Sequence, residues 1–259
     1  MQKSIGKIAL AGSGNIAWHL ANGFKLQGYE ITGIWSRTKS NALELAENCG
    51  ALVYEEISDL RKNADMIILA VADNAIEEVA SHIRKFDGIL VHTAGSVPMD
   101  VLKDSFINYG VFYPLQTFSK GTPVDLSEVP FFLESSSNEV FQAIKQAALS
   151  LSAKVYEADS HQRMLLHVAA VFAGNYSNLM YTISNELIKS SGLPKEILHP
   201  LILETARKAA SGDPLKMQTG PARRNDTSTI EKHIETLASL PEYAELYRLL
   251  ANLISNKYK

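Results

Sequence analysis

The stretch KIALAGSGNIAWHLA, residues 7–21, constrains the fold most, because it spells G-x-G-x-x-A between a short apolar run and a helical pattern. Gly12 permits a tight turn, Gly14 lets the backbone approach a pyrophosphate, and Ala17 lets the helix pack closely on the strand. The free N–H groups of a helix that begins near Asn15 would face the phosphates. Such glycines can also serve only the turn, but their place at the start of a βαβαβ pattern favours dinucleotide binding.

Apolar runs alternate with amphipathic stretches along the first part of the chain. The predicted strands are 7–11, 31–35, 66–71 and 89–92, with weaker strands near residues 111, 131 and 155. From about Asp159 the strand signals stop, and helices are predicted at about 160–190, 195–210, 228–238 and 242–255. We therefore expect an α/β Rossmann-type parallel-sheet domain over residues 1–157, followed by an all-α helical domain over residues 158–259.

The residues after the second predicted strand indicate which dinucleotide binds. NAD enzymes place an acid there to bond the ribose 2′-hydroxyl. This chain instead has Ser36, Arg37, Thr38 and Lys39. A hydroxyl, a guanidinium and an ammonium suit the 2′-phosphate of NADP, and Arg37 could also stack on the adenine. The alternative is a basic loop that faces water. We take NADP as the expected cofactor.

Two further loops, 70–73 and 92–98, follow predicted strands and should border the cofactor, because ligands bind outside the carboxyl edge of open α/β sheets. His92 could be catalytic, or it could be a strand-end histidine that the backbone satisfies. The predicted cofactor-binding residues are Gly12, Ser13, Gly14, Asn15, Ile16, Ser36, Arg37, Thr38, Val71, Ala72, His92 and Ala94.

Residues 164–185, MLLHVAAVFAGNYSNLMYTISN, contain no Asp, Glu, Lys or Arg. A surface helix should carry a charged face, so we expect this helix to be buried against other helices, a partner subunit or the first domain. A membrane span is disfavoured because its polar residues would be costly in hydrocarbon. His167 and Asn178 share a face, and Asn175 is offset from it. Such groups bond either one another or a ligand, and His167 could exchange a proton with a substrate.

The segment TGPARRND, residues 219–226, breaks the helical half with Gly220-Pro221 and then carries Arg223 and Arg224. Ser228 with Glu231 predicts a capping box that starts the next helix. A helix N-terminus with an adjacent guanidinium favours an anion, so either arginine could hold a substrate carboxylate. The alternative is a solvated turn beside a helix cap.

Composition excludes several classes. The 259 residues are 46% apolar and 20% charged with a net charge of −3, and this mix is typical of an ordinary globular protein with no nucleic-acid or membrane partner. Cys49 is the single cysteine, so no internal disulfide can form and a cysteine-based metal site is not expected. No residue is predicted as a metal ligand. A reducing, cytoplasmic setting is expected, because the N-terminal apolar run is also too brief for a secretion signal.

The motifs AGSGNIA, SRT, HTAGS, YPLQTF, HVAAVFAGNYSN and TGPARRND, in this order, resemble a family of predicted NADP-dependent oxidoreductases. Its members join a Rossmann-like domain to a helical domain of unclear role. The fold is similar to that of pyrroline-carboxylate reductase, ketopantoate reductase and the phosphogluconate dehydrogenase superfamily, and the N-terminal domain also resembles deazaflavin-dependent NADP oxidoreductases. The resemblance implies a substrate between the domains and a dimer through the helical half. The chain departs from the family at Tyr113-Pro114, where relatives often have His-Pro.

We expect an NADP-dependent oxidoreductase that moves hydride between the nicotinamide and a small carbonyl or imine substrate with an anionic group. A 2-oxo acid such as ketopantoate is one candidate, by fold analogy. The expected partners are this substrate and a second copy in a homodimer, and the predicted catalytic residues are His167, Asn175, Asn178 and Arg223. The alternative is a non-catalytic NADP(H)-binding sensor that engages a protein through its helical half.

Overall fold

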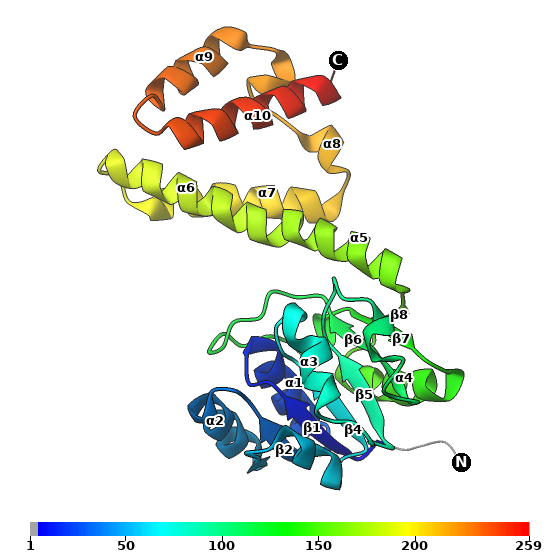
Figure 1. The fold of residues 1–259 in the computed structure, drawn as a ribbon. Coiled ribbons are helices and arrows are strands. Elements are labelled where there is room, and N and C mark those ends of the chain that lie inside the picture. The colour runs from blue at the N-terminus through cyan, green and yellow to red at the C-terminus, as the bar shows by residue number, and fades with distance from the viewer. Residues whose placement is uncertain (1–4, 259) are drawn as a thin grey trace. The chain divides into compact units, whose positions relative to one another are not determined.

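The computed structural model describes residues 5–258 and divides into two compact units, one ending at Asn175 and the other beginning at Tyr176. The first unit holds a sheet and the second is helical (Figure 1). The last strand ends at Glu157, where the sequence predicts the domain boundary. The helix that follows this strand still belongs to the first unit. The boundary at residue 157 therefore stays a prediction.

The first unit contains an eight-stranded sheet in the order β3-β2-β1-β4-β5-β6-β7-β8. Its strands are β1 (Lys7–Ala11), β2 (Glu30–Trp35), β3 (Leu52–Val53), β4 (Met66–Leu69), β5 (Ile89–His92), β6 (Tyr109–Pro114), β7 (Phe131–Ser135) and β8 (Val155–Glu157). This is the Rossmann order, in which the chain reverses direction across the sheet between β1 and β4. The predicted Rossmann-type α/β class is confirmed, and the short β3 was not predicted.

Strand β7 departs from the predicted parallel sheet, because it pairs antiparallel with β6. A parallel pair needs a crossover, usually through a helix. The segment between β6 and β7 contains only the short 3₁₀ turn η4 (Leu126–Glu128), so the chain returns beside β6 in the opposite direction. The sheet is therefore mostly parallel, as predicted, with β7 as the strand that departs from it.

Helices and 3₁₀ turns cover both faces of the sheet (Figure 1). Ile8 and Leu10 of β1 belong to the core beneath α1 (Asn15–Leu26), α2 (Lys39–Cys49) and α4 (Asn138–Leu151). Ala9 and Ala11, which point to the other face, belong to the core beneath η1 (Ile57–Asn63), α3 (Ile76–Ser81) and η3 (Met99–Leu102). Burial on both faces explains why the central strands read as unbroken apolar runs.

Helices make up the second unit, and the helical segments predicted there are present. Its helices are α6 (Ser177–Ser190), α7 (His199–Ser211), α8 (Pro214–Met217), α9 (Thr227–Thr236) and α10 (Pro241–Lys257), and only the short α8 was not predicted. Helix α9 packs against α10, where His233 Nδ1 and the Tyr247 hydroxyl lie 2.7 Å apart. The Tyr243 hydroxyl of α10 donates to the carboxylate of Glu186 on α6.

The charge-free segment is helical throughout, through α5 (Ser160–Ala170), the π-helix η5 (Val171–Tyr176) and α6. The expected burial within the chain is not found, because no residue of η5 or α6 is buried. Leu165 is 59% exposed and Phe172 is 64% exposed. Cover of this helix by the first domain or by a partner subunit stays a prediction.

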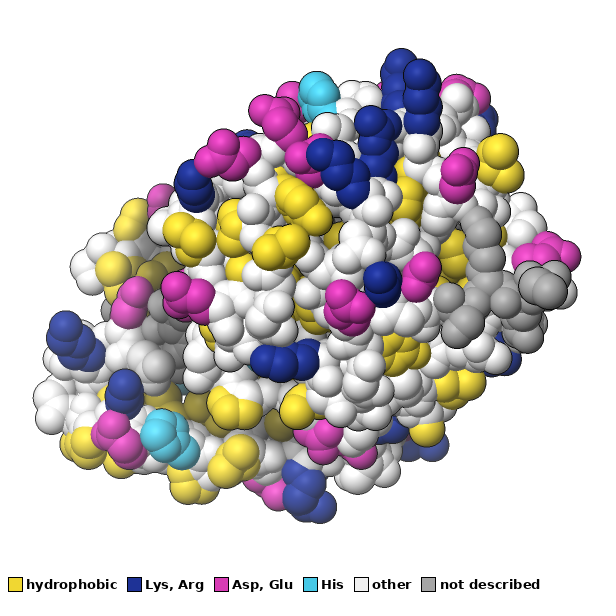
Figure 2. Space-filling view, turned by 90° about the horizontal axis from the view of Figure 1, so that it is seen from below, with side chains coloured by type: hydrophobic (Ala, Val, Ile, Leu, Met, Phe, Trp, Pro, Cys, Tyr) yellow, Lys and Arg dark blue, Asp and Glu magenta, His cyan; other side chains and the backbone are white. Residues whose placement is uncertain are grey.

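Charged side chains of both signs are interspersed over the face in Figure 2, with apolar side chains between them. This mixed surface agrees with the small net charge of −3. Among residues 5–258, no helix is both long and apolar enough to cross a membrane.

Candidate cofactor and active site

The turn between β1 and α1 has a geometry that only glycine tolerates at its first position. Gly12 has φ of +113°, and a Cβ there would lie 2.1 Å from the carbonyl oxygen of Ala70. Gly14 is the N-cap of α1, and a Cβ at Gly14 would have no atom within 4 Å. Open space beside the free N–H groups of a helix N-terminus suits a pyrophosphate. The turn therefore fits the predicted dinucleotide.

A groove of about 210 Å³ lies at this edge of the sheet, between the loops that follow the adjacent strands β2, β1 and β4. Its lining includes the predicted residues Gly12, Ser13, Gly14, Ser36, Arg37, Val71 and Ala72. It also includes Trp35, Asn41, Ala75 and Val79, which the sequence reasoning missed. The position of Asn41 in the first turn of the helix after the Ser-Arg-Thr motif could have indicated it, whereas the apolar residues carry no such signal.

One end of this groove suits a 2′-phosphate. The Ser13 and Ser36 hydroxyls lie 2.8 Å apart and connect the loops after β1 and β2. Lys39, which the sequence groups with Arg37, instead lies 2.6 Å from the carboxylate of Glu55 and lowers the pKa of that carboxyl. Arg37 is exposed and forms no hydrogen bond or ion pair with the residues that the structure describes. Its guanidinium is therefore the free cation at this end of the groove.

The other predicted cofactor residues have mixed surroundings. Asn15 begins α1, and its side-chain oxygen accepts the N–H of Lys120 at 3.0 Å, so its backbone rather than its side chain is left to face a phosphate. Ile16 packs against the core under α1. Thr38 is the N-cap of α2 and forms no side-chain cap bond. Ala94 is buried in the loop after β5. Contact of these residues with the cofactor stays a prediction.

His92 is a core histidine at the end of β5, with none of its surface exposed. Its Nδ1 accepts the N–H of Ala94 at 3.2 Å, and its Nε2 has no hydrogen-bond partner among residues 5–258. Burial, followed by the charge of Arg163, lowers the pKa of His92 to about 3, although the Pro98 backbone acts in the opposite direction. A buried, neutral imidazole is poorly suited to exchange a proton with a substrate, so the geometry favours His167 over His92 for that role.

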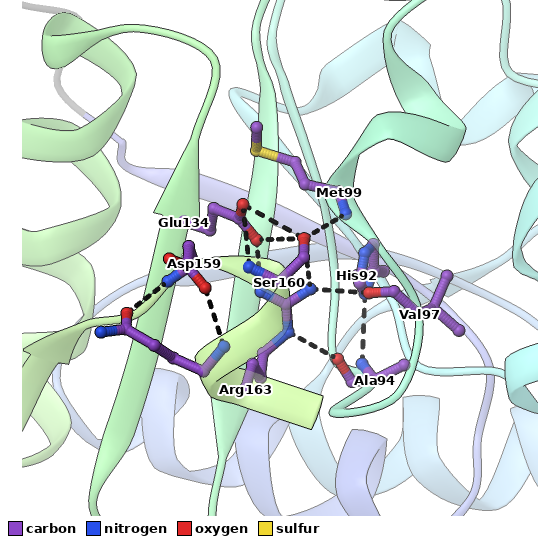
Figure 3. A network of polar contacts seen from close by, with 9 residues as sticks. His92, Ala94, Val97, Met99, Glu134, Asp159, Ser160 and Arg163 are labelled. Atoms are coloured by element: carbon purple, nitrogen blue, oxygen red, sulfur yellow. Dashed lines mark hydrogen bonds and ion pairs between the residues drawn. The ribbon is translucent and has the colours of Figure 1, made fainter. Parts of the chain in front are cut away.

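Arg163 holds the loop after β5 from within the protein (Figure 3). Its side chain is fully buried, with Nε donating to the carbonyl of Ala94 at 3.3 Å and an Nη donating to that of Val97 at 2.6 Å. The other Nη pairs with the carboxylate of Glu134 on β7, which also accepts the Ser160 hydroxyl at 2.9 Å. The network ties α5, β7 and the loop together, and sequence reasoning gave Arg163 no role.

His167 lies one helical turn after Arg163 on α5, and on the same face. Its Nδ1 is 3.2 Å from the hydroxyl of Tyr113, near the carboxyl end of β6. A Cβ at Gly95 would lie 2.8 Å from the Tyr113 ring and 2.9 Å from His167 Nδ1. His167, Tyr113 and Gly95 therefore meet at the sheet edge where the cofactor loops lie. Tyr113 was not predicted as a site residue, although the YPLQTF motif and the departure at Tyr113-Pro114 could have indicated it.

The two predicted asparagines lie further along the same helical run, in different units. Asn175 is exposed within the π-helix η5, and such π-segments are frequent at functional sites. Asn178 is exposed on α6, and it belongs to the second unit, as does Arg223. The grouping of Asn175, Asn178 and Arg223 with His167 in one site stays a prediction.

The two arginines of the 219–226 loop in the second unit differ in their contacts. Arg223 donates to the carbonyl of Gln218 at 2.7 Å, and its guanidinium lies 5.2 Å from the ring centre of Tyr258. Arg224 is exposed and forms no hydrogen bond or ion pair with the described residues. Arg223 is thus held by its own unit, and Arg224 is left free for an anion.

The predicted cap of the next helix is wrong by two residues. Helix α9 begins at Thr227, and the carboxylate of Asp226 accepts the N–H of Thr229 at 3.1 Å. Asp is as good an N-cap as Ser, and the left-handed conformation of Asn225 turns the chain one residue earlier. Asp226 is occupied by Thr229, so it does not restrain either arginine through a hydrogen bond.

No group of three or more His, Cys, Asp or Glu side chains among residues 5–258 is arranged to hold a metal ion.

Two family models match the chain. Residues 7–94 match the model described as "NADP oxidoreductase coenzyme F420-dependent". Residues 129–254 match a domain of unknown function, DUF2520, whose match begins inside the sheet, just before β7. No functionally curated protein was found to match the chain.

Solved structures extend these matches to nearly the whole chain. The "putative NADP oxidoreductase BF3122" of Bacteroides fragilis is 41% identical, with 99% of this chain and 100% of that chain covered and a TM-score of 0.93. A pyrroline-5-carboxylate reductase from Coxiella burnetii is 17% identical, with coverage of 97% and 98% and a TM-score of 0.59. A reductive aminase from Aspergillus terreus is also 17% identical, with coverage of 98% and 93% and a TM-score of 0.69.

The last two likenesses show a shared fold, whereas the first shows a shared family. An NADP oxidoreductase family agrees with the groove, the glycine turn and the unpaired Arg37 described above. An oxidoreductase, rather than a non-catalytic sensor, is therefore the class to which the protein belongs. The chain is a member of the family of NADP oxidoreductases that join a Rossmann-type domain to a DUF2520 domain, and its cofactor is NADP.

Proposed function

We propose that the protein transfers hydride between the nicotinamide of NADP and a small carbonyl or imine substrate that carries an anionic group. His167 would exchange the proton, and Asn175 and Asn178 would orient the substrate. The single observation that carries the proposal is the meeting of His167, Tyr113 and Gly95 at the carboxyl edge of β5 and β6. That edge continues the line of loops that forms the cofactor groove after β2, β1 and β4.

Imines with a carboxylate are supported by the proteins that share the fold. They include pyrroline-5-carboxylate reductases and a reductive aminase in complex with NADPH and ethyl levulinate. The first group acts on a cyclic imine that bears a carboxylate. A 2-oxo acid such as ketopantoate has the same two parts, a group that accepts hydride and a carboxylate. Both classes therefore belong in a substrate screen.

The anionic group of the substrate would bind an arginine of the 219–226 loop. Arg224 is the better candidate than Arg223, because Arg223 is engaged by the Gln218 carbonyl and the Tyr258 ring. A free guanidinium can hold a carboxylate through two parallel hydrogen bonds.

The protein would act as a homodimer whose second copy covers the apolar face of α5 and α6. Only Ala222, Leu237, Ala244 and Ala251 are buried among the described residues of the second unit. A small domain with so little buried apolar surface is not expected to be stable alone. Leu165, Val168, Phe172, Tyr176 and Leu179 of the long helix are all at least 46% exposed. Monomeric proteins rarely leave such a row of large apolar side chains in water.

The test is a screen of small 2-oxo acids and cyclic imines, including ketopantoate and 1-pyrroline-5-carboxylate, with NADPH consumption followed by absorbance. We expect turnover with at least one compound that carries a carboxylate, and little with its methyl ester. His167→Ala should lower turnover by about 10²- to 10⁴-fold, as is usual when a general acid is removed. NADPH affinity, measured by fluorescence titration, should not change.

The matched control is His161→Ala, because His161 is exposed on the same helix and lies six residues before His167. That variant should keep wild-type turnover. Unchanged turnover in His167→Ala would show that His167 does not exchange the proton. Equal rates with the acid and its methyl ester would show that the substrate needs no anionic group.

A further inference from the structure

The contact between Tyr113 and His167 indicates which ring nitrogen of His167 carries the hydrogen. The Tyr113 hydroxyl lies 3.2 Å from His167 Nδ1, and the two rings meet edge to face with centres 6.2 Å apart. Tyr113 is 7% exposed, so most of its side chain is buried. Which ring nitrogen of a neutral histidine carries the proton is set by the hydrogen bond that the other nitrogen makes.

The hydroxyl of Tyr113 has one hydrogen to donate, and His167 Nδ1 is the only acceptor that lies within bonding distance among the described residues. If Nδ1–H donated to Tyr113 instead, the hydroxyl hydrogen would have no acceptor among residues 5–258, which is the less favourable arrangement. Burial, and then the charge of Asp73, raises the pKa of Tyr113, so the hydroxyl keeps its hydrogen. Donation from Tyr113 to Nδ1 is therefore the satisfied arrangement.

We propose that Tyr113 is a positioning residue that holds neutral His167 in the Nε2–H tautomer. Nε2–H is then a donor, and it has no lone pair with which to accept a proton. A donor at this place stabilises the oxygen or nitrogen that gains negative charge as hydride arrives at a carbonyl or imine carbon. When Nε2 gives its proton to that atom, Nδ1 takes the hydroxyl proton of Tyr113, so His167 stays neutral and water then reprotonates Tyr113. The pair thus suits reduction by NADPH. This inference rests on the proposed function, in which His167 faces the substrate.

The surroundings hold the pair in one geometry. Gly95 leaves no room for a side chain between its own backbone, the Tyr113 ring and His167. Arg163 fixes the same loop through the carbonyls of Ala94 and Val97 (Figure 3). His167 follows Arg163 by four residues on α5, so the two side chains share a helix face. The side chain of Ser96 in this loop donates to the carboxylate of Asp73, which follows β4. The loop that carries Gly95 is thus fastened on both sides of that residue.

The test is a long-range ¹H–¹⁵N correlation spectrum of protein labelled at its histidines, recorded at about pH 8.5, where an ordinary histidine is neutral. The signal of His167 is identified by its loss in His167→Gln. We expect the wild-type protein to show a protonated Nε2 and an acceptor Nδ1. In Tyr113→Phe, which keeps the ring and removes the hydroxyl, the His167 signals should move toward the averaged shifts of two exchanging tautomers.

Tyr109→Phe is the matched control, because Tyr109 lies on the same strand and its hydroxyl makes no hydrogen bond with the described residues. It should leave the His167 spectrum unchanged. A protonated Nδ1 in the wild type, or identical His167 shifts in wild type and Tyr113→Phe, would overturn the inference.

The outcome is separable from that of the proposed function, because the tautomer is read without turnover. If His167→Ala retains full turnover, the proposed function fails even when Tyr113→Phe changes the tautomer. If His167→Ala loses turnover and Tyr113→Phe leaves the tautomer unchanged, only the role of Tyr113 fails. NADPH titration should give the same affinity for Tyr113→Phe and the wild type, which excludes a damaged cofactor groove.

Discussion

At the scale of single residues, the contacts of a cationic side chain decide whether it can bind a ligand. Arg163 is fully buried, and its guanidinium donates to the Glu134 carboxylate and to two loop carbonyls. Lys39 is exposed but paired with Glu55. Arg37 is exposed and has no partner among the described residues, so its donors are free for a ligand. Sequence places Arg37 and Lys39 together, and only their contacts separate them.

Arg37→Ala should therefore raise the dissociation constant for NADPH by about 10- to 100-fold, because hydrogen bonds to charged groups contribute about 1.5–3 kcal/mol. Affinity for NADH, which lacks the 2′-phosphate, should change little. Lys39→Ala is the control, and it should affect NADPH binding much less because Lys39 is held by Glu55. Fluorescence titration measures all three proteins, and equal losses in the two variants would contradict the assignment.

His92 should make stability depend on pH in acid. Its pKa is about 3 in the folded protein and about 6.5 in an unfolded chain. As pH falls below 6.5, the unfolded chain binds the proton first. The free energy of unfolding is therefore unaffected by His92 above about pH 6.5 and decreases as pH falls toward 3. At pH 5 the loss should be about 2 kcal/mol, at roughly 1.4 kcal/mol per pH unit.

Urea unfolding at several pH values tests this dependence. His92→Asn keeps an acceptor for the Ala94 N–H but does not titrate, so its stability should fall less steeply between pH 7 and pH 5 than that of the wild type. His82→Asn, at an exposed histidine, should keep the wild-type slope. Parallel curves for wild type and His92→Asn would assign the acid sensitivity to other groups.

At the scale of elements, the junction of β1 with α1 separates two demands on glycine. Gly12 meets a backbone demand, since its φ is +113° and the Ala70 carbonyl fills the place of a Cβ. Gly14 meets a ligand demand, since its φ of −75° suits any residue and nothing fills the space beside it. The two glycines of the motif are therefore required for different physical reasons.

Gly12→Ala should destabilise the fold by about 2–5 kcal/mol through strain and overpacking. Gly14→Ala should change stability by less than about 1 kcal/mol and weaken NADPH binding at least about 10-fold, because its methyl group would occupy the pyrophosphate cradle. Thermal unfolding and fluorescence titration give the two readouts. A stable Gly12→Ala protein, or a Gly14→Ala protein that binds NADPH normally, would contradict this division.

At the scale of the whole molecule, the two units differ in how much apolar surface they bury. The first has a core on each face of its sheet, whereas the described part of the second buries only a few small or single apolar side chains. We propose that a second copy of the chain covers the helical unit. The lack of charge over residues 164–185 has the same explanation.

Leu165→Glu should convert the proposed dimer to a monomer at about 10 µM, because each copy would place a charge in an apolar interface. Ile107→Glu is the control, since Ile107 is 87% exposed and lies outside the long helix. It should remain dimeric. Light scattering with size-exclusion chromatography measures the mass, and a monomeric wild type at this concentration would remove the dimer from the proposal.

Much of the fold follows from local pattern. The glycine turn and the apolar strands of the first unit were predictable because they depend on backbone geometry and on burial of neighbouring residues. The antiparallel β7 was not, because strand direction depends on the path of residues 115–130. The cap of α9 was misplaced because Asp226 and Ser228 are equally good caps, and only the turn at Asn225 chooses between them.

The Rossmann-type class, the helical half and NADP as the cofactor could be predicted from the sequence, because each depends on residues close together in the chain. Tertiary structure alone decided that Lys39 is paired, that His92 is a buried core residue and that Arg163 fixes the β5 loop. It also decided that Tyr113 meets His167, 54 positions away in the sequence. Such contacts join residues that no local periodicity relates, so they arise only when the sheet and helix α5 are assembled.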